Sequence, residues 1–111
     1  MGNLNLDIYF SEDSEVAEYE ALSKGYRIDV YVKIDENVFN LSVYTLIRLQ
    51  QDFDTECETY GFYTPDPNII FVKEVKKNEI ITTVNRLFEQ KFFEKLKPLD
   101  RIDVLEMVRI S

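Results

Sequence analysis

Five carboxylates lie close together in the stretch from Gln50 to Asn68, QQDFDTECETYGFYTPDPN, which also contains the only cysteine of the chain. Four of them are spaced two residues apart and the fifth follows in a turn: Asp52, Asp54, Glu56, Glu58 and Asp66. Acidic side chains at this spacing can bind a cation, act as a general acid and base, or form a surface for a basic partner. The rest of the sequence distinguishes these possibilities.

Metal binding and catalysis are both disfavoured. The pairs Asp52–Glu56 and Asp54–Glu58 have i,i+4 spacing and could face one cation on a helix, but the sequence contains no D-x-D-x-D-G calcium loop. It contains no histidine, so the commonest zinc ligand and general base are missing, and a Ser-His or Cys-His pair is impossible. Its three glycines form no phosphate-binding loop. We expect no catalytic residues, no metal and no cofactor.

A small carboxylate-dependent enzyme is the remaining catalytic alternative. Glycoside hydrolysis needs two carboxyl groups in a cleft, one of them in an apolar environment. The acids of this stretch fall on the polar side of a predicted helix, so an acidic surface is the better interpretation.

Composition and charge limit the class of protein. A chain of 111 residues with 45% hydrophobic residues suits one domain, 1–111. The net charge of −8 disfavours direct binding to nucleic acid or to an anionic membrane. The sequence shows neither a basic signal-peptide start nor an apolar run long enough to span a membrane, and a single cysteine permits no internal disulfide. We therefore expect a cytoplasmic protein.

Alternating apolar residues predict the strands. The first is Leu4–Phe10, and Tyr26–Ile34 and Val38–Tyr44 form a β-hairpin around an Asp-Glu-Asn turn. A short apolar run at Ile69–Val75 predicts a central strand. In the first hairpin strand, the pattern places Tyr26, Ile28, Val30, Val32 and Ile34 toward the core, and Arg27, Asp29, Tyr31 and Lys33 outward.

Two main helices are predicted. One begins after Thr45 as N-cap, ends at Gly61 and carries an apolar stripe that we expect to lie in the core: Leu46, Leu49, Phe53, Cys57 and Tyr60. The other begins at Asn78 as cap and continues to about Leu96. Residues 11–24 could be a short helix, capped by Ser11 or Ser14 and ended by Gly25, or a loop, and residues 99–111 could be a strand or a loose helix.

Together these elements predict an α+β domain. Its sheet is mixed or mainly antiparallel and contains the β-hairpin, and the two main helices pack on one face.

The charge is distributed unevenly along the chain. Residues 1–71 contain 14 of the 21 acidic residues and only four of the 13 basic ones, whereas residues 72–111 have a small positive balance. Two acidic clusters cause this asymmetry: Glu12, Asp13, Glu15, Glu18 and Glu20 in the first, and Asp52, Asp54, Glu56, Glu58 and Asp66 in the second. Like charges held close together repel each other, so such clusters favour either full solvation or a basic partner.

Tyrosines accompany the second cluster, and tyrosine is enriched in protein interfaces. The sequence therefore predicts a partner-binding surface, and either acidic cluster could form it. Our candidate set is Asp52, Asp54, Glu56, Glu58, Tyr60, Tyr63 and Asp66.

Three stretches carry a family resemblance: VYTLIRL, YGFYTPDPNIIFVKEV and NEIITTVNRLFEQKFFEKLKP. Over residues 26–97 the chain resembles the small cytoplasmic immunity proteins of bacterial polymorphic toxin systems, including contact-dependent growth inhibition. The resemblance implies a non-enzymatic inhibitor that binds a cognate toxin domain, often a nuclease, and blocks its active site or substrate path. A nuclease toxin must be basic to hold nucleic acid, and an acidic antidote is complementary to it. No binding residue is transferred from the family, because its members use different surfaces.

Other binding functions stay open at this point. An adaptor or regulator for a different basic protein would differ only in its partner. A nucleic-acid mimic or nuclease accessory would bind nucleic-acid-handling proteins in general.

Overall fold

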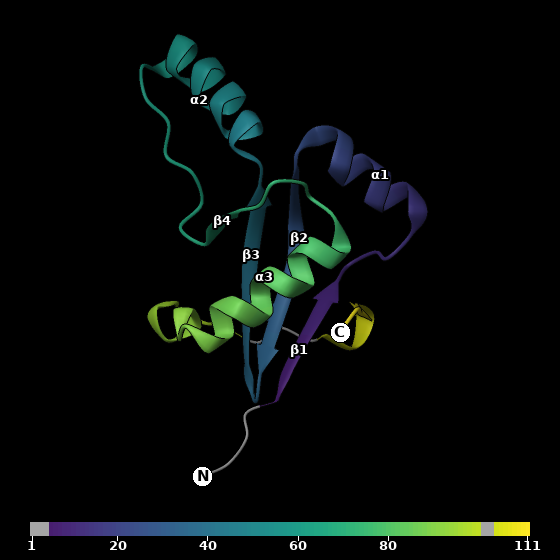
Figure 1. Ribbon diagram of the computed structural model, residues 1–111. Helices are drawn as coiled ribbons and strands as arrows, with labels where there is room; N and C mark the ends of the chain where they lie inside the picture. Colours follow the sequence, from purple (N-terminus) through teal and green to yellow (C-terminus); the bar gives the residue numbers. More distant parts are fainter. Residues whose placement is uncertain (1–4, 101–103) are drawn as a thin grey trace.

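A five-stranded mixed sheet organises the protein, for which a computed structural model describes residues 5–100 and 104–111 (Figure 1). The strand order is β4-β3-β2-β1-β5, and only the β3–β4 pair is parallel. The strands are β1 (Leu6–Phe10), β2 (Tyr26–Ile34), β3 (Asn37–Tyr44), β4 (Ile69–Phe71) and β5 (Val108–Arg109). The predicted α+β class and β-hairpin are confirmed, and the proposed start of the first strand at Leu4 lies outside the described residues.

Three α-helices accompany the sheet: α1 (Glu15–Lys24), α2 (Leu46–Tyr60) and α3 (Lys77–Glu89). In Figure 1, α3 crosses one face of the sheet, whereas α1 and α2 lie toward the ends of the strands. The undecided region 11–24 thus contains a helix, with Ser14 as N-cap and Gly25 as C-cap. The undecided tail contains a short 3-10 helix, η2 (Val104–Glu106), followed by β5, and residues 101–103 of it lie outside the described part.

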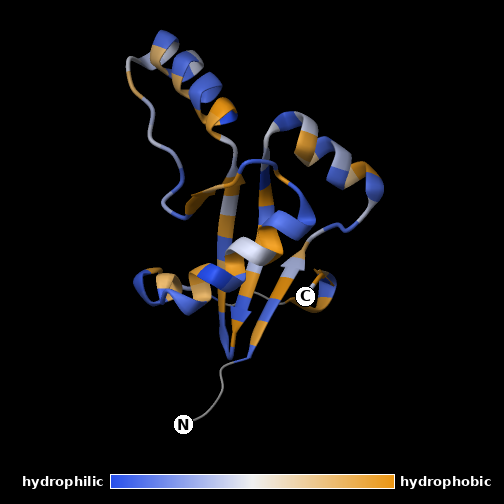
Figure 2. Cartoon of the chain, viewed as in Figure 1, coloured by the Kyte–Doolittle hydropathy of each residue, from blue (hydrophilic) through white to orange (hydrophobic). Residues whose placement is uncertain are grey.

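The core lies between one face of the sheet and α3. Strand register places Phe10 opposite Val30 and Val30 opposite Leu41, so these side chains share a face. Ile80 and Val84 of α3 are fully buried against them. Figure 2 shows the resulting alternation of apolar and polar residues along the three long strands. The buried cluster is Ile8, Phe10, Ala21, Val30, Val32, Ile34, Phe39, Leu41, Val43, Ile70, Val75, Ile80, Val84 and Phe93.

A β-bulge in β2 reverses the predicted faces at one end of the strand. The register with β3 shifts between Arg27 and Val30, which inserts an extra residue and changes the side to which the preceding residues point. Arg27 is consequently buried at 6% exposure, although the alternation placed it outside, and Ile28 is 53% exposed, although the alternation placed it in the core. The prediction from strict alternation was wrong for these residues, because the hydrophobic pattern of a strand does not reveal a bulge.

The buried guanidinium of Arg27 contacts three residues: Phe10, Glu12 and Asp29. It stacks on the ring of Phe10, with 3.5 Å between the central carbon and the ring centroid, and donates from Nε to Asp29 over 2.6 Å. It also donates to the backbone carbonyl of Glu12. The second oxygen of Asp29 accepts the backbone N–H and the hydroxyl of Ser11. These bonds fasten the loop between β1 and α1 to the bulge, so Asp29 is not the outward sheet residue that the sequence predicted.

The pKa of Asp29 reflects these contacts. Burial raises it, but the hydrogen bonds from Arg27 and Ser11, the charge of Arg27 and the N–H of Glu12 outweigh burial and hold the pKa below its ordinary value of 3.8. The folded state therefore favours the ionised carboxylate.

Acidic side chains of α1 and its preceding loop hold the start of α3. The backbone N–H of Lys77 donates to the Glu18 carboxylate, 3.1 Å from one oxygen and 3.2 Å from the other, and the ammonium of Lys77 lies 2.7 Å from Asp13. A carboxylate at a helix N-terminus is stabilised by the unpaired N–H groups and the helix dipole. The expected cap Asn78 is wrong: the N-cap is Lys76, without a side-chain bond, and Glu18 supplies the acceptor from another helix.

The last predicted helix is interrupted. α3 ends at Glu89, Lys91 has a left-handed φ of 61°, and the chain resumes as the 3-10 helix η1 (Phe92–Lys95). This reversal turns Phe93 back into the core, where it lies 5.4 Å from the ring of Phe39. The expected continuous helix to Leu96 is therefore wrong. The strand expected at 69–75 is also shorter than predicted and lies at the edge of the sheet, paired only with β3.

Replacing Asp29 with Asn tests the bulge network. Asp29→Asn keeps the shape but removes the charge that Arg27 requires, so we expect the free energy of unfolding to fall by about 1–3 kcal/mol at neutral pH. Because the folded pKa of Asp29 is lowered, its stabilisation is present above the unfolded pKa and is lost as the pH falls through the folded value. Urea denaturation should thus show the two proteins converging as the pH falls below about 3.8. Asp54→Asn, on an exposed helix position, is the matched control. A constant difference at all pH values would contradict this account.

Candidate protein-binding site

The helix α2 stands away from the body of the protein. It follows β3 directly and projects beyond the end of the sheet (Figure 1). None of its 15 residues, all of which belong to the described part of the chain, is buried. The molecule is elongated as a result, with extents of 50 × 31 × 25 Å. The sequence-predicted helix is present, but the sheet does not cover it.

Polar and aromatic contacts hold α2 at its base. Thr45 caps the helix as predicted, accepting from the N–H of Arg48 over 3.2 Å, and its own N–H donates to the carbonyl of Gly25 over 2.9 Å. Gly25 has a φ of 77°, and a Cβ at this position would lie 2.9 Å from the hydroxyl of Thr45, so only glycine fits. Arg48 stacks on Tyr26 with 4.6 Å to the ring centroid, and Tyr26 in turn stacks on Tyr44. These contacts position the helix without burying its apolar side.

The apolar stripe of α2, defined as Leu46, Leu49, Phe53, Cys57 and Tyr60, is largely open to solvent. Phe53 is 48% exposed and Tyr60 is 67% exposed, while Leu49 and Cys57 are only half-buried. The prediction that this side lies in the core is therefore wrong. Periodicity identifies an apolar helix face but does not identify what covers it.

Four of the seven predicted site residues are brought together on the side of α2 that faces the following loop. Asp52, Glu56 and Asp66 all act electrostatically on Tyr63, and Asp52 and Asp66 also act on Tyr44. Two of the acids have further partners: Asp52 pairs with Arg48 over 3.0 Å, and Asp66 accepts from the hydroxyl of Ser42 over 3.0 Å. The hydrogen bonds of Asp66 with Ser42 and of Tyr63 with Tyr44 tie the loop after α2 to β3.

The two tyrosines in this group have raised pKa values. For Tyr63, burial is the largest cause, followed by the charges of Asp52, Asp66 and Glu56, against a lowering hydrogen bond with Tyr44. For Tyr44, burial again comes first, followed by Tyr63, Asp52 and Asp66, while Arg48 lowers the value. Both phenols therefore stay neutral at neutral pH and keep their capacity to donate a hydrogen bond.

The other three predicted residues point away from this group. Asp54 and Glu58 are exposed on successive turns of α2, and Asp54 accepts from the side chain of Gln50 over 2.9 Å. Tyr60 is exposed in the last turn, next to Gly61, whose φ of 82° ends the helix as predicted. The second acidic cluster therefore has an inner pair, Asp52 and Glu56, and an outer pair, Asp54 and Glu58.

Sequence reasoning missed an apolar groove at the base of α2. Ile47 is 74% exposed and Leu46 66%. Together with Phe71 at the end of β4 and Val72 directly after it, they line an open groove of about 400 Å³. Exposed apolar side chains in contact with one another mark interaction surfaces more often than isolated ones do. The sequence signal that could have indicated this groove was Ile47, an apolar residue that lies off the apolar stripe and was not predicted to be in the core.

The first acidic cluster is used inside the molecule. Asp13 and Glu18 bind Lys77, and Glu20 pairs with Lys24 over 3.9 Å. The second cluster, together with the apolar stripe and the groove, is therefore the better candidate for an external partner.

The described residues limit other chemistry. Within residues 5–100 and 104–111, no group of three or more Cys, Asp or Glu side chains is placed to hold a metal ion. In the same ranges, no helix has the length and apolar character needed to cross a lipid bilayer. The inner and outer acids lie along a projecting helix and not in a cleft, an arrangement suited to binding a protein surface.

Comparison of the chain with protein-family models, with curated proteins and with solved structures finds no match in any of the three.

Truncating side chains on α2 and α3 tests whether the stripe is exposed. We expect Phe53→Ala to lower the free energy of unfolding by less than about 1 kcal/mol, because a half-exposed ring loses little burial. Ile80→Ala, in a fully buried position of α3, should lower it by about 2–5 kcal/mol. Urea denaturation of both variants gives the comparison. Similar losses in the two variants would mean that α2 folds onto the sheet in solution.

Proposed function

We propose that this chain is a cytoplasmic immunity protein that binds a cognate basic toxin domain through α2 and the loop that follows it, and so blocks the active site or substrate path of the toxin. The toxin is of the nuclease class in this proposal, because a nuclease presents the basic surface that an acidic inhibitor complements.

The projection of α2 with an uncovered apolar stripe is the observation that carries the proposal. An amphipathic helix of about this length is marginal in water when nothing packs on its apolar side. The described part of this chain buries no residue of α2. Phe53 and Tyr60 offer aromatic anchors, and the groove at Leu46 and Ile47 offers a recess for an apolar side chain of the partner.

Charge supports a basic partner over a neutral one. The acids Asp54 and Glu58 flank the stripe on exposed positions, and Asp52 and Glu56 border it on the other side. Arg48 is the one basic residue of α2, and it is already paired with Asp52. The helix therefore presents an apolar centre with an acidic rim, and a matching partner has an apolar centre with a basic rim. Such complementarity accelerates association, which an antidote to a toxin requires.

The rival binding function, an adaptor for another basic protein, uses the same surface and differs only in the partner. The identity of the partner therefore has to come from a binding experiment with a defined candidate. A pull-down with the product of the gene adjacent to the one for this chain distinguishes immunity from an adaptor role.

The interface prediction separates charge from apolar contact. With the purified toxin domain encoded by the adjacent gene, Asp54→Asn/Glu58→Gln should slow association roughly threefold to tenfold at low salt and remove much of its salt dependence. Phe53→Ala/Tyr60→Ala should weaken binding at least about tenfold, mainly through faster dissociation. Surface plasmon resonance at two salt concentrations measures both effects.

Glu15→Gln/Glu20→Gln is the matched control, because it makes the same charge change on exposed positions of α1. It should leave the association and dissociation rates close to those of the unaltered chain. Equal effects of the α1 and α2 charge variants would show a general field and not an interface. Unchanged affinity in both α2 variants would exclude α2 as the binding surface.

A further inference from the structure

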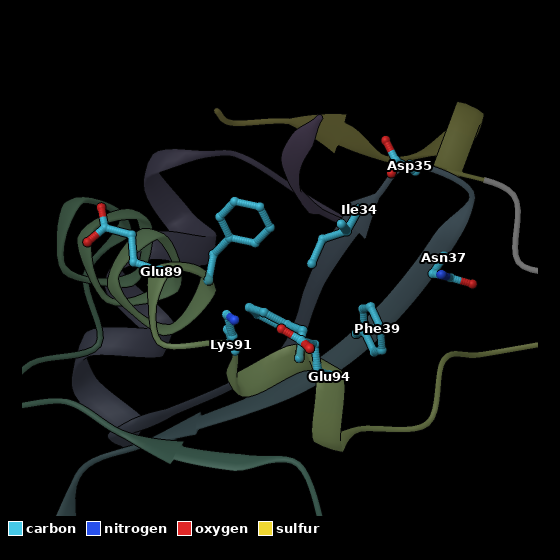
Figure 3. Close-up of a pocket in the computed structure, with 9 residues that line it drawn as sticks. Ile34, Asp35, Asn37, Phe39, Glu89, Lys91 and Glu94 are labelled. Carbon is cyan, nitrogen blue, oxygen red and sulfur yellow. The ribbon is translucent and has the colours of Figure 1, made fainter. Parts of the chain in front are cut away.

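A second recess lies at the opposite end of the hairpin from α2. We call it the hairpin-end pocket; it has a volume of about 410 Å³ and lies between the β2–β3 turn, the end of α3 and η1 (Figure 3). The sheet end at which α2 begins is about 25 Å away, the length of eight strand residues. The pocket therefore belongs to a different surface from the one proposed to bind a toxin. Its volume falls in the range of roughly 300–1,000 Å³ typical of small-molecule sites.

The floor of the pocket is apolar and mostly aromatic. It is formed by Ile34, Phe39, Phe88 and Phe93, and the rings of Phe39 and Phe93 lie 5.4 Å apart at an angle of 49°. Phe39 and Phe93 are almost completely buried, so packing holds these rings in place. A rigid apolar floor of this kind offers dispersion contacts to a bound group, chiefly through Phe88, which is half-buried.

The rim of the pocket is acidic. Asp35, Glu89 and Glu94 line the recess together with a single base, Lys91; in Figure 3 Glu94 lies next to Lys91, and the carboxylates of Asp35 and Glu89 point outward, away from Ile34 and Phe39. Among the described residues, no ion pair neutralises any of these four side chains. Three carboxylates against one ammonium leave the opening with an excess of negative charge.

The backbone builds this opening at some conformational cost. Asp35 and Lys91 are the two non-glycine residues with positive φ in the described part of the chain, and both line the pocket. Lysine gains no local hydrogen bond from its side chain in this conformation, unlike aspartate or asparagine. The turn at Lys91 separates α3 from η1, and residues of both helices line the recess.

We propose that the hairpin-end pocket binds a small organic cation with an apolar body, of the quaternary-ammonium or protonated-amine class. The apolar body lies on the phenylalanine floor, and the cationic head lies at the rim beside Glu94, within the negative field of Asp35 and Glu89. An anion is repelled by the rim, and a strongly hydrated inorganic cation gains nothing from the aromatic floor. A neutral apolar molecule gains no electrostatic attraction from the carboxylates.

The test is an NMR titration of the ¹⁵N-labelled full chain with benzyltrimethylammonium. Two related probes separate the contributions: benzyl alcohol has the ring without the charge, and tetramethylammonium has the charge without the ring. We expect benzyltrimethylammonium to shift the backbone amides of Phe39, Phe88, Lys91 and Glu94. Its affinity should exceed that of either related probe at least fivefold.

Charge variants test whether the negative charge of the rim strengthens benzyltrimethylammonium binding. Glu89→Gln/Glu94→Gln should weaken benzyltrimethylammonium binding about fivefold to tenfold and leave benzyl alcohol binding unchanged. Lys91→Gln should strengthen it about twofold, because it removes the one positive charge from the rim. Asp54→Asn/Glu58→Gln, the same charge change at the far end of the molecule, is the matched control and should have no effect.

Three results would overturn the proposal. Equal affinity for benzyl alcohol and benzyltrimethylammonium would show an apolar recess without cation selectivity. Shifts of these amides that depend on protein concentration without any probe would show that a second copy of the chain covers the pocket. No shift with any probe would exclude a binding site there, and none of these results bears on the toxin-binding proposal.

Discussion

The buried guanidinium of Arg27 is the interaction on which the arrangement of the helices depends. A buried charge is stable only when it is paired and hydrogen-bonded, and Arg27 meets this condition through Asp29, the carbonyl of Glu12 and the ring of Phe10. The same Asp29 holds Ser11, so the loop before α1 is fixed to the bulge of β2. α1 then places Glu18 at the N-terminus of α3, and α3 covers the sheet. A charge network therefore places the helix that completes the hydrophobic core.

This arrangement divides the acidic residues between two roles. The first cluster compensates charges within the fold. Asp13 binds the ammonium of Lys77, and Glu18 accepts the backbone N–H of Lys77 at the start of α3. The second cluster surrounds a helix whose single base, Arg48, is already paired with Asp52. Sequence alone favoured the second cluster because tyrosines accompany it, but left the first cluster possible as an interface. The contacts of the folded chain separate them, because a carboxylate held in an internal ion pair is less available to a partner than an exposed one.

Local rules predicted the elements well and their environment less well. The hairpin and the caps Thr45 and Gly61 follow from turn and capping chemistry, which depends on a few neighbouring residues. The reversal at Arg27 and the break at Lys91 depend on contacts between distant elements. The exposure of Phe53 could not be predicted either, because one amphipathic pattern serves a core helix and a binding helix equally. Of the seven site residues, the sequence placed all on or after one helix, but it could not show that three of them, Asp52, Glu56 and Asp66, gather around a fourth, Tyr63.

The construction of α2 bears on how the proposed interaction would proceed. A helix that formed only on binding would add its ordering entropy to the free energy of association and slow the encounter. Here Thr45 and Gly61 satisfy backbone groups at both ends, and Arg48 links the first turns to Asp52 and to Tyr26. These contacts stabilise the helix from its polar side and leave the apolar stripe uncovered. A helix formed in advance keeps its aromatic anchors in fixed positions, so binding spends less of its energy on ordering the chain and more on contact with the partner.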